Sequence, residues 1–280
     1  MPFSEETLTR LKADAAEVIG RYPRARSALL PLLQLVQSEE GYVSDDGIAF
    51  CAEILGCTQT EVRGVATFYT MYKHSLAGEY QVGVCTNTLC AIMGGDQIYA
   101  ELAEHLGGAP QGSAPQGSAP QGSAPQGSAP QGSAPQGNAP QGSAPQGNGH
   151  HDIITADGKV GLERIECNAA CDYAPVIMVN WEFYDNMTPE KAKQLVDDLR
   201  AGNPPAPTRG PSQLCTWKEA SRILAGFGDG RASEGPSAGH ASLVGLKIAK
   251  ENGWKAPEPD RDSEQEPPAK TAPKTTGGTK

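Results

Sequence analysis

Two pairs of closely spaced cysteines constrain this chain more than any other feature of its sequence. The first pair, Cys85 and Cys90, follows an alternating apolar run that ends at Val84. The second pair, Cys167 and Cys171, lies much further along and follows a second run with the character of a β-strand. A fold that places these two strands side by side therefore also brings four thiols together.

The spacing within each pair indicates what the four thiols bind. The motifs are C-x4-C and C-x3-C, whereas structural zinc sites favour C-x2-C and thioredoxin-type redox dithiols need C-x-x-C. The wider loops suit a [2Fe–2S] cluster, with two thiolates for each iron. Zinc without a redox role, and disulfides within the pairs, stay open as alternatives. We interpret Cys51 and Cys57 as packing residues and Cys215 as either a packing residue or a bystander.

Charge and composition exclude several classes of function. The net charge is −10, which argues against a nucleic-acid partner. We expect no direct membrane span, because no run of eighteen apolar residues occurs. The first residues also lack the basic and apolar regions of a signal peptide. Seven cysteines in uneven spacing are typical of a reducing, cytoplasmic setting.

The pattern of apolar residues divides the chain into parts. Helical spacing and a capping box that begins at Thr58 predict a helical bundle over residues 1–76. Alternating residues from Tyr80 then predict an α/β domain over residues 77–202. Within that domain Ile165 falls out of phase with the residues before it, so we expect a bulge near residues 163–164.

Two segments have too few apolar residues to form a core of their own. Residues 109–148 are tandem APQGS or APQGN pentapeptides, without charge or large apolar side chains. They predict a disordered insertion within the α/β domain. Residues 203–280 are rich in proline, glycine and charge, which predicts an extended, largely disordered tail that orders on a partner.

Three stretches of this sequence resemble a known family. They are GVATFYT at residues 64–70, VCTNTLC at 84–90 and ECNAACDYAP at 166–175. Together they are similar to the thioredoxin-fold [2Fe–2S] subunit, often called the E subunit, of the respiratory NADH–quinone oxidoreductase, complex I. The resemblance covers roughly residues 10–200, without the repeats. The same module occurs in NAD-linked hydrogenases and formate dehydrogenases, so an equivalent diaphorase subunit of such an enzyme is the alternative.

The resemblance implies a fold and a role. The fold is an N-terminal helical bundle followed by a thioredoxin-like [2Fe–2S] ferredoxin domain, with a cis peptide bond before Pro175. The cluster accepts single electrons from the FMN of a partner subunit that also binds NADH, so this chain holds no complete active site alone. Other iron–sulfur subunits of the peripheral arm, on the cytoplasmic side of the membrane-bound complex, are further partners. The cluster ligands implied are Cys85, Cys90, Cys167 and Cys171.

Overall fold

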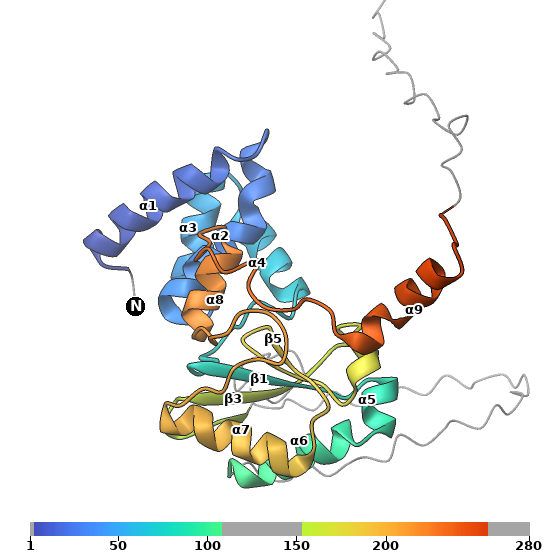
Figure 1. The fold of residues 1–280 in the computed structure, drawn as a ribbon. Coiled ribbons are helices and arrows are strands. Elements are labelled where there is room, and N and C mark those ends of the chain that lie inside the picture. Colours follow the sequence, from blue (N-terminus) through green and yellow to red (C-terminus); the bar gives the residue numbers. More distant parts are fainter. Residues whose placement is uncertain (1–2, 108–152, 257–280) are drawn as a thin grey trace, which may run out of the picture. The chain divides into compact units, whose positions relative to one another are not determined.

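The structure of this protein is a computed structural model that describes residues 3–107 and 153–256 (Figure 1). The chain forms two compact units, Met1–Ser237 and Ala238–Lys280, and each is considered by itself. The pentapeptide repeats and the end of the predicted tail lie outside the described residues.

Helices fill the N-terminal part of the first unit, as the apolar spacing predicts. The first helix is capped by Ser4, whose side chain accepts a hydrogen bond from the Thr7 N–H, and the capping box at Thr58 is present. Pro31 is accommodated in the first turn of its helix, where its missing N–H has no intrahelical partner to lose. The elements are α1 (Glu5–Ile19), η1 (Ala25–Ala28), α2 (Leu29–Glu40), α3 (Asp45–Leu55) and α4 (Gln59–Phe68).

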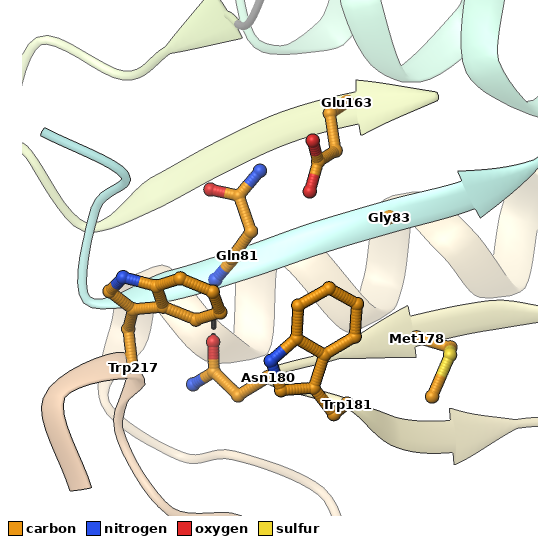
Figure 2. Close-up of a pocket in the computed structure, with 7 residues that line it drawn as sticks. All are labelled: Gln81, Gly83, Glu163, Met178, Asn180, Trp181 and Trp217. Atoms are coloured by element: carbon orange, nitrogen blue, oxygen red, sulfur yellow. Dashed lines mark hydrogen bonds between the residues drawn. The ribbon is translucent and has the colours of Figure 1, made fainter. Parts of the chain in front are cut away.

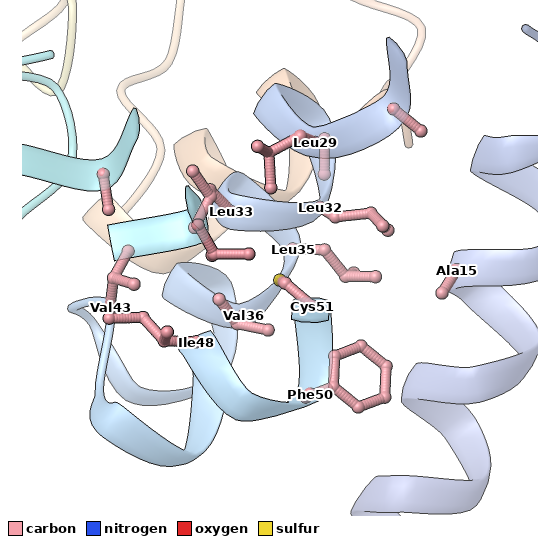
Figure 3. Packing of buried hydrophobic residues seen from close by; sticks show 14 of the residues in the cluster. Ala15, Leu29, Leu32, Leu33, Leu35, Val36, Val43, Ile48, Phe50 and Cys51 are labelled. Atoms are coloured by element: carbon pink, nitrogen blue, oxygen red, sulfur yellow. The ribbon is translucent and has the colours of Figure 1, made fainter. Parts of the chain in front are cut away.

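The central helix of this bundle is α2, which is apolar around most of its circumference and is buried accordingly. Figure 3 shows its leucines and Val36 directed at α3 and α1. Cys51 on α3 points into the same core and is fully buried, which confirms the interpretation of this cysteine as a packing residue. Burial raises the pKa of the Cys51 thiol to about 12.

A mixed sheet forms the second half of the first unit. Its strand order is β2-β3-β1-β4-β5; β1 is parallel to β3, and the other neighbouring pairs are antiparallel. Helices α6 and α7 lie side by side on one face of the sheet (Figure 1). The bounds are β1 (Tyr80–Cys85), β2 (Ile153–Ile154), β3 (Val160–Ile165), β4 (Ile177–Val179), β5 (Glu182–Tyr184), α6 (Gly95–His105) and α7 (Pro189–Ala201).

The bulge expected in β3 is wrong. The pairing of β3 with β1 continues one residue to one residue as far as Ile165, which lies opposite Cys85. Ile165 is in phase with Glu163, and the two side chains share the face of the sheet opposite α6 and α7. Glu163 is buried there because it forms an ion pair with Lys73 at 2.5 Å. Because the charged Glu163 occupies a buried position, the sequence of this regular strand lacks the apolar alternation of its first residues.

The first part of the predicted tail, residues 203–237, packs on the chain itself, whereas we expected it to order on a partner. Residues 203–237, here called the strap, pack on the chain's own first unit and include α8 (Trp217–Leu224). Trp217 is 1% exposed, and its Nε1 donates to the carbonyl oxygen of Gly41 at the end of α2. The Trp217 N–H donates to the carbonyl of Glu79, just before β1. The strap therefore joins the bundle to the sheet.

Aromatic and amide side chains line the seam beneath the strap (Figure 2). Trp181 and Trp217 lie with ring centroids 5.8 Å apart. Asn180 accepts a hydrogen bond from the Gln81 N–H and donates to the carbonyls of Glu79 and Cys215. Asn180 thus ties β4, β1 and the strap together around a cavity of about 10 Å³.

The second unit contains one described helix, α9 (His240–Glu251). No side chain of this helix is buried, although it carries apolar residues such as Leu243 and Leu246. Within residues 3–107 and 153–256, no helix combines the length and apolar character needed to cross a membrane.

Candidate metal centre

The sheet brings the two predicted cysteine pairs to one edge. Strand β1 ends at Cys85, and its parallel neighbour β3 ends at Ile165, directly opposite Cys85. Cys167 follows two residues later. Because the carboxyl ends of neighbouring parallel strands meet at the same edge of a sheet, the loops after β1 and β3 are adjacent. The short helix α5 (Thr88–Ile92) after β1 carries Cys90.

The two pairs differ in exposure. Cys85 and Cys90 are each 3% exposed and pack in one cluster with Ala170 and Val176. Cys167 and Cys171 are exposed, and their Sγ atoms lie 3.8 Å apart. That separation is too long for a disulfide, in which the sulfurs are about 2.05 Å apart. The site is therefore buried on one side and open on the other.

The sulfur distance in the exposed pair fits two thiolates bound to one metal ion. Two thiolates bound at about 2.3 Å to one tetrahedral ion lie about 3.8 Å apart, as the Cys167 and Cys171 sulfurs do. Among the described residues, no three His, Cys, Asp or Glu side chains converge as a mononuclear site would require. A [2Fe–2S] cluster needs two thiolates on each of two irons instead. The two cysteine pairs supply that number of thiolates.

The pKa values of two of the four thiols are raised above their ordinary value. Burial is the largest cause that raises the pKa of Cys90 to about 11, and the thiols of Cys85 and Cys171 contribute in the same direction. The pKa of Cys171 is raised chiefly by its hydrogen bond with Cys167, with a smaller contribution from Cys85. Each of these two shifts includes a smaller contribution from a cysteine of the other pair.

Gly95 is required for the close packing around the buried pair. A Cβ atom added there would lie 2.5 Å from the carbonyl oxygen of Cys85 and 2.9 Å from that of Cys90. The preceding residue, Gly94, has φ +108°, a conformation that favours glycine. The Gly-Gly pair is visible in the sequence, but nothing local reveals that this turn presses against both Cys85 and Cys90.

Hydrogen-bond donors lie near two of the sulfurs. The side-chain amide of Asn87 is 3.9 Å from the Cys85 Sγ and also donates to the carbonyl of Ile165, so it bridges the ends of β1 and β3. The Ala169 N–H donates to the Cys167 Sγ at 3.4 Å. Donors of this kind stabilise thiolate charge and tune the potential of a bound cluster.

The loop that carries Cys171 is held in place from several sides. It continues through the 3₁₀ turn η2 (Cys171–Tyr173) to a cis peptide bond between Ala174 and Pro175, as the resemblance implied. The carbonyl of Tyr173 accepts from the Asn186 N–H, and that of Val176 accepts from the Cys85 N–H. The second cysteine loop is thus bonded to the end of β1 and to the segment after β5.

This fold and these cysteine pairs define a class of protein. The model of the thioredoxin-like [2Fe–2S] ferredoxin family matches residues 15–119 and 146–200, more than half of the chain. The matched region contains both cysteine pairs and ends before the strap. The chain is a thioredoxin-like [2Fe–2S] ferredoxin, and the members of this family carry a [2Fe–2S] cluster.

Comparison with known proteins narrows the class. The E subunit of the NADH-quinone oxidoreductase of Mycobacterium tuberculosis strain H37Rv is 49% identical over 256 residues, which are 91% of this chain and 85% of the relative. NADH-quinone oxidoreductase subunit 2 of Thermus thermophilus is 30% identical over 66% of this chain and 82% of its own length. The chain belongs to the family of NADH-quinone oxidoreductase E subunits and is an oxidoreductase subunit.

One solved structure also aligns with part of the chain. It is the crystal structure of an NAD+-reducing [NiFe]-hydrogenase in the air-oxidised state, with a TM-score of 0.44 and 14% identity. The alignment covers 63% of this chain and 23% of the other. A likeness this low bears neither on the fold nor on the function of the present chain.

Proposed function

We propose that Cys85, Cys90, Cys167 and Cys171 hold the [2Fe–2S] cluster of this subunit, with one close pair on each iron. The observation that carries the assignment is the arrangement of the two cysteine pairs in adjacent loops at the ends of the parallel strands β1 and β3. When bound, such a cluster supplies one-electron redox chemistry. The chain contributes the ligands, the hydrogen bonds to their sulfurs and the exclusion of water from the buried pair.

We propose further that the subunit accepts single electrons from the FMN of a partner that binds NADH. The asymmetry of the site supports this role, because one pair is sealed inside the domain while Cys167 and Cys171 face outward. A redox partner therefore has one open side from which to approach. The names of the relatives, subunits of NADH-quinone oxidoreductase, support an assembly with NADH as electron source.

The helix beside the buried pair offers a surface for that partner. On α5, Ile92 is 78% exposed and Met93, directly after it, is 54% exposed, although both are apolar. Leu89 on the same helix is also exposed. Exposed apolar groups that cluster in this way mark protein interfaces. We propose that they contact the flavin subunit in the peripheral arm of the complex, on its cytoplasmic side, near other iron–sulfur subunits.

The ligand assignment is tested on anaerobically purified protein. Each of the four cysteines is changed to serine, and iron, acid-labile sulfide and the EPR spectrum after dithionite reduction are measured. We expect two irons and two sulfides per chain in the unchanged protein, in keeping with one [2Fe–2S] cluster, and a loss of the signal in all four variants. Cys57→Ser is the matched control and keeps the signal. Full signal in Cys171→Ser would contradict the assignment.

The electron-transfer role is tested with the flavin partner present. Ile92→Asp places a charge on the exposed face of α5 and leaves the ligands unchanged. We expect normal iron content but weaker association with the flavin subunit and slower reduction of the cluster by NADH. Leu76→Asp, also at an exposed apolar residue, is the control. Equal reduction rates in both variants and the unchanged protein would refute the proposed surface.

A further inference from the structure

A buried ion pair lies behind the loop that carries Cys171. The Arg209 Nε and Nη2 atoms donate to the two carboxylate oxygens of Asp185 at 2.8 and 2.9 Å. The side chains are only 14% and 6% exposed, respectively. Arg209 comes from the strap, beyond the residues that the family model matches, and Asp185 directly follows β5.

The same arginine contacts the cysteine loop itself. Its guanidinium carbon lies 4.1 Å from the centroid of the Phe183 ring on β5 and 5.4 Å from that of Tyr173. Tyr173 belongs to the turn η2 that begins with Cys171. A cation over aromatic faces is attracted to them, and most strongly where water is excluded. Arg209 thus bridges the edge strand β5 and the turn that presents a sulfur to the cluster.

Hydrogen bonds fix the strap beside this arginine. The N–H and hydroxyl of Thr208 both donate to the Phe183 carbonyl, at 2.8 and 2.9 Å. The Thr208 hydroxyl also lies 2.8 Å from the Asp185 carboxylate and accepts from the Asp185 N–H. The strap therefore runs along the free edge of β5 and presents Arg209 in one orientation.

We propose that Arg209 is a positioning residue for the [2Fe–2S] cluster. It holds the Cys171 turn against the edge of the sheet, and its pairing with Asp185 keeps the charge behind the cluster balanced. The proposal rests on the assignment of Cys171 as a ligand. It gives the strap a part in the redox site, although the strap contributes no ligand.

Breaking the Arg209–Asp185 pair has two effects, the loosening of the Cys171 turn and a change of charge near the cluster, and they can be told apart. Removing Arg209 loosens the turn and leaves the Asp185 carboxylate buried without its cation, whereas removing the Asp185 charge leaves an unpaired guanidinium. A negative charge left near the cluster disfavours the added electron, and a positive charge favours it. The two substitutions therefore shift the reduction potential in opposite directions. A purely structural loosening has no such dependence on the sign of the charge.

The experiment compares Arg209→Gln, Asp185→Asn and the double variant as cluster-loaded proteins. Two readouts are measured: the rate of iron loss to a chelator and the midpoint potential by EPR-monitored titration. We expect faster iron loss in Arg209→Gln, by about tenfold, the effect usual for residues that support metal ligands. We expect its potential to fall, that of Asp185→Asn to rise, and that of the double variant to lie between them.

Two further variants serve as controls. Arg209→Lys keeps the charge but loses the two-pronged pairing and the stacking, so we expect faster iron loss without a fall in potential. Arg200→Gln breaks a more exposed ion pair with Asp157 and is expected to change neither readout. Shifts of Arg209→Gln and Asp185→Asn in the same direction, or no shift in either, would overturn the proposal. A cluster that persists in Cys171→Ser would instead overturn the ligand assignment.

Discussion

Replacing Trp217 by alanine is expected to destabilise the first unit severely. Truncation of a buried tryptophan typically costs about 3–5 kcal/mol, and Trp217 is 1% exposed at the junction of the bundle and the sheet. The change also removes the hydrogen bond from its Nε1 to the Gly41 carbonyl, a further loss of about 1 kcal/mol. We expect a total of about 4–6 kcal/mol, which is comparable with the whole stability of many domains.

Urea unfolding followed by circular dichroism measures this loss. We expect a lower midpoint and a smaller dependence on urea, because a strap detached in the native state leaves less surface to expose on unfolding. Trp217→Phe retains most of the packing and should lose about 1–2 kcal/mol. Trp254→Ala, at a tryptophan 67% exposed, should change stability by less than about 0.5 kcal/mol. A loss below about 1 kcal/mol in Trp217→Ala would refute the role given to this side chain.

Three further predictions concern single side chains. Gly95→Ala should lower the iron content, because its Cβ would meet the carbonyls of both Cys85 and Cys90. The control is Gly64→Ala, in open space on α4. It should keep the iron content and gain about 0.5–1 kcal/mol of stability. Desolvation raises the pKa of Glu182 above its ordinary value of 4.5. The folded state is therefore favoured at low pH and loses stability as the pH rises through the raised pKa. Glu182→Gln should remove that loss when unfolding is measured as a function of pH. Iodoacetamide at pH 8 should label the half-buried Cys57 much faster than Cys51, because burial raises the pKa of the Cys51 thiol to about 12. Equal labelling of the two cysteines, measured by mass spectrometry, would contradict this prediction.

Local signals were sufficient to predict much of the fold. The cap at Ser4 and the capping box at Thr58 depend on side chains within three residues of the helix start, so the sequence displays them directly. The alternation from Tyr80 to Val84 likewise predicted β1. These features are encoded in neighbouring residues, and tertiary contacts had little opportunity to override them.

The candidate site was predictable for a related reason. The C-x4-C and C-x3-C spacings place each pair within a single loop, so the sequence shows both pairs, and the resemblance implied how they combine. The pairing of β1 with β3 places the two cysteine loops at the same edge of the sheet. The assignment of the four cysteines as ligands still awaits the serine substitutions.

The features that sequence analysis missed all depend on long-range partners. Glu163 led to the expectation of a bulge, because nothing local reveals that Lys73 lies against it and allows a charged side chain to be buried. The strap looked like a tail that orders on a partner, since a few apolar residues among prolines and glycines do not indicate what they cover. Composition indicated a segment with too few apolar residues for a core of its own, but it could not show that residues 203–237 pack on the same chain.

Because the strap packs on its own chain, it can support the redox site directly. The family model ends at residue 200, yet the edge of β5 and the back of the Cys171 turn are covered by residues after it. An uncovered strand edge has unpaired backbone groups and invites unwanted pairing. The strap satisfies the β5 edge through Thr208 and delivers Arg209 to the same place. Truncating the chain after residue 202 would therefore remove a support of the cluster loop as well as a tail.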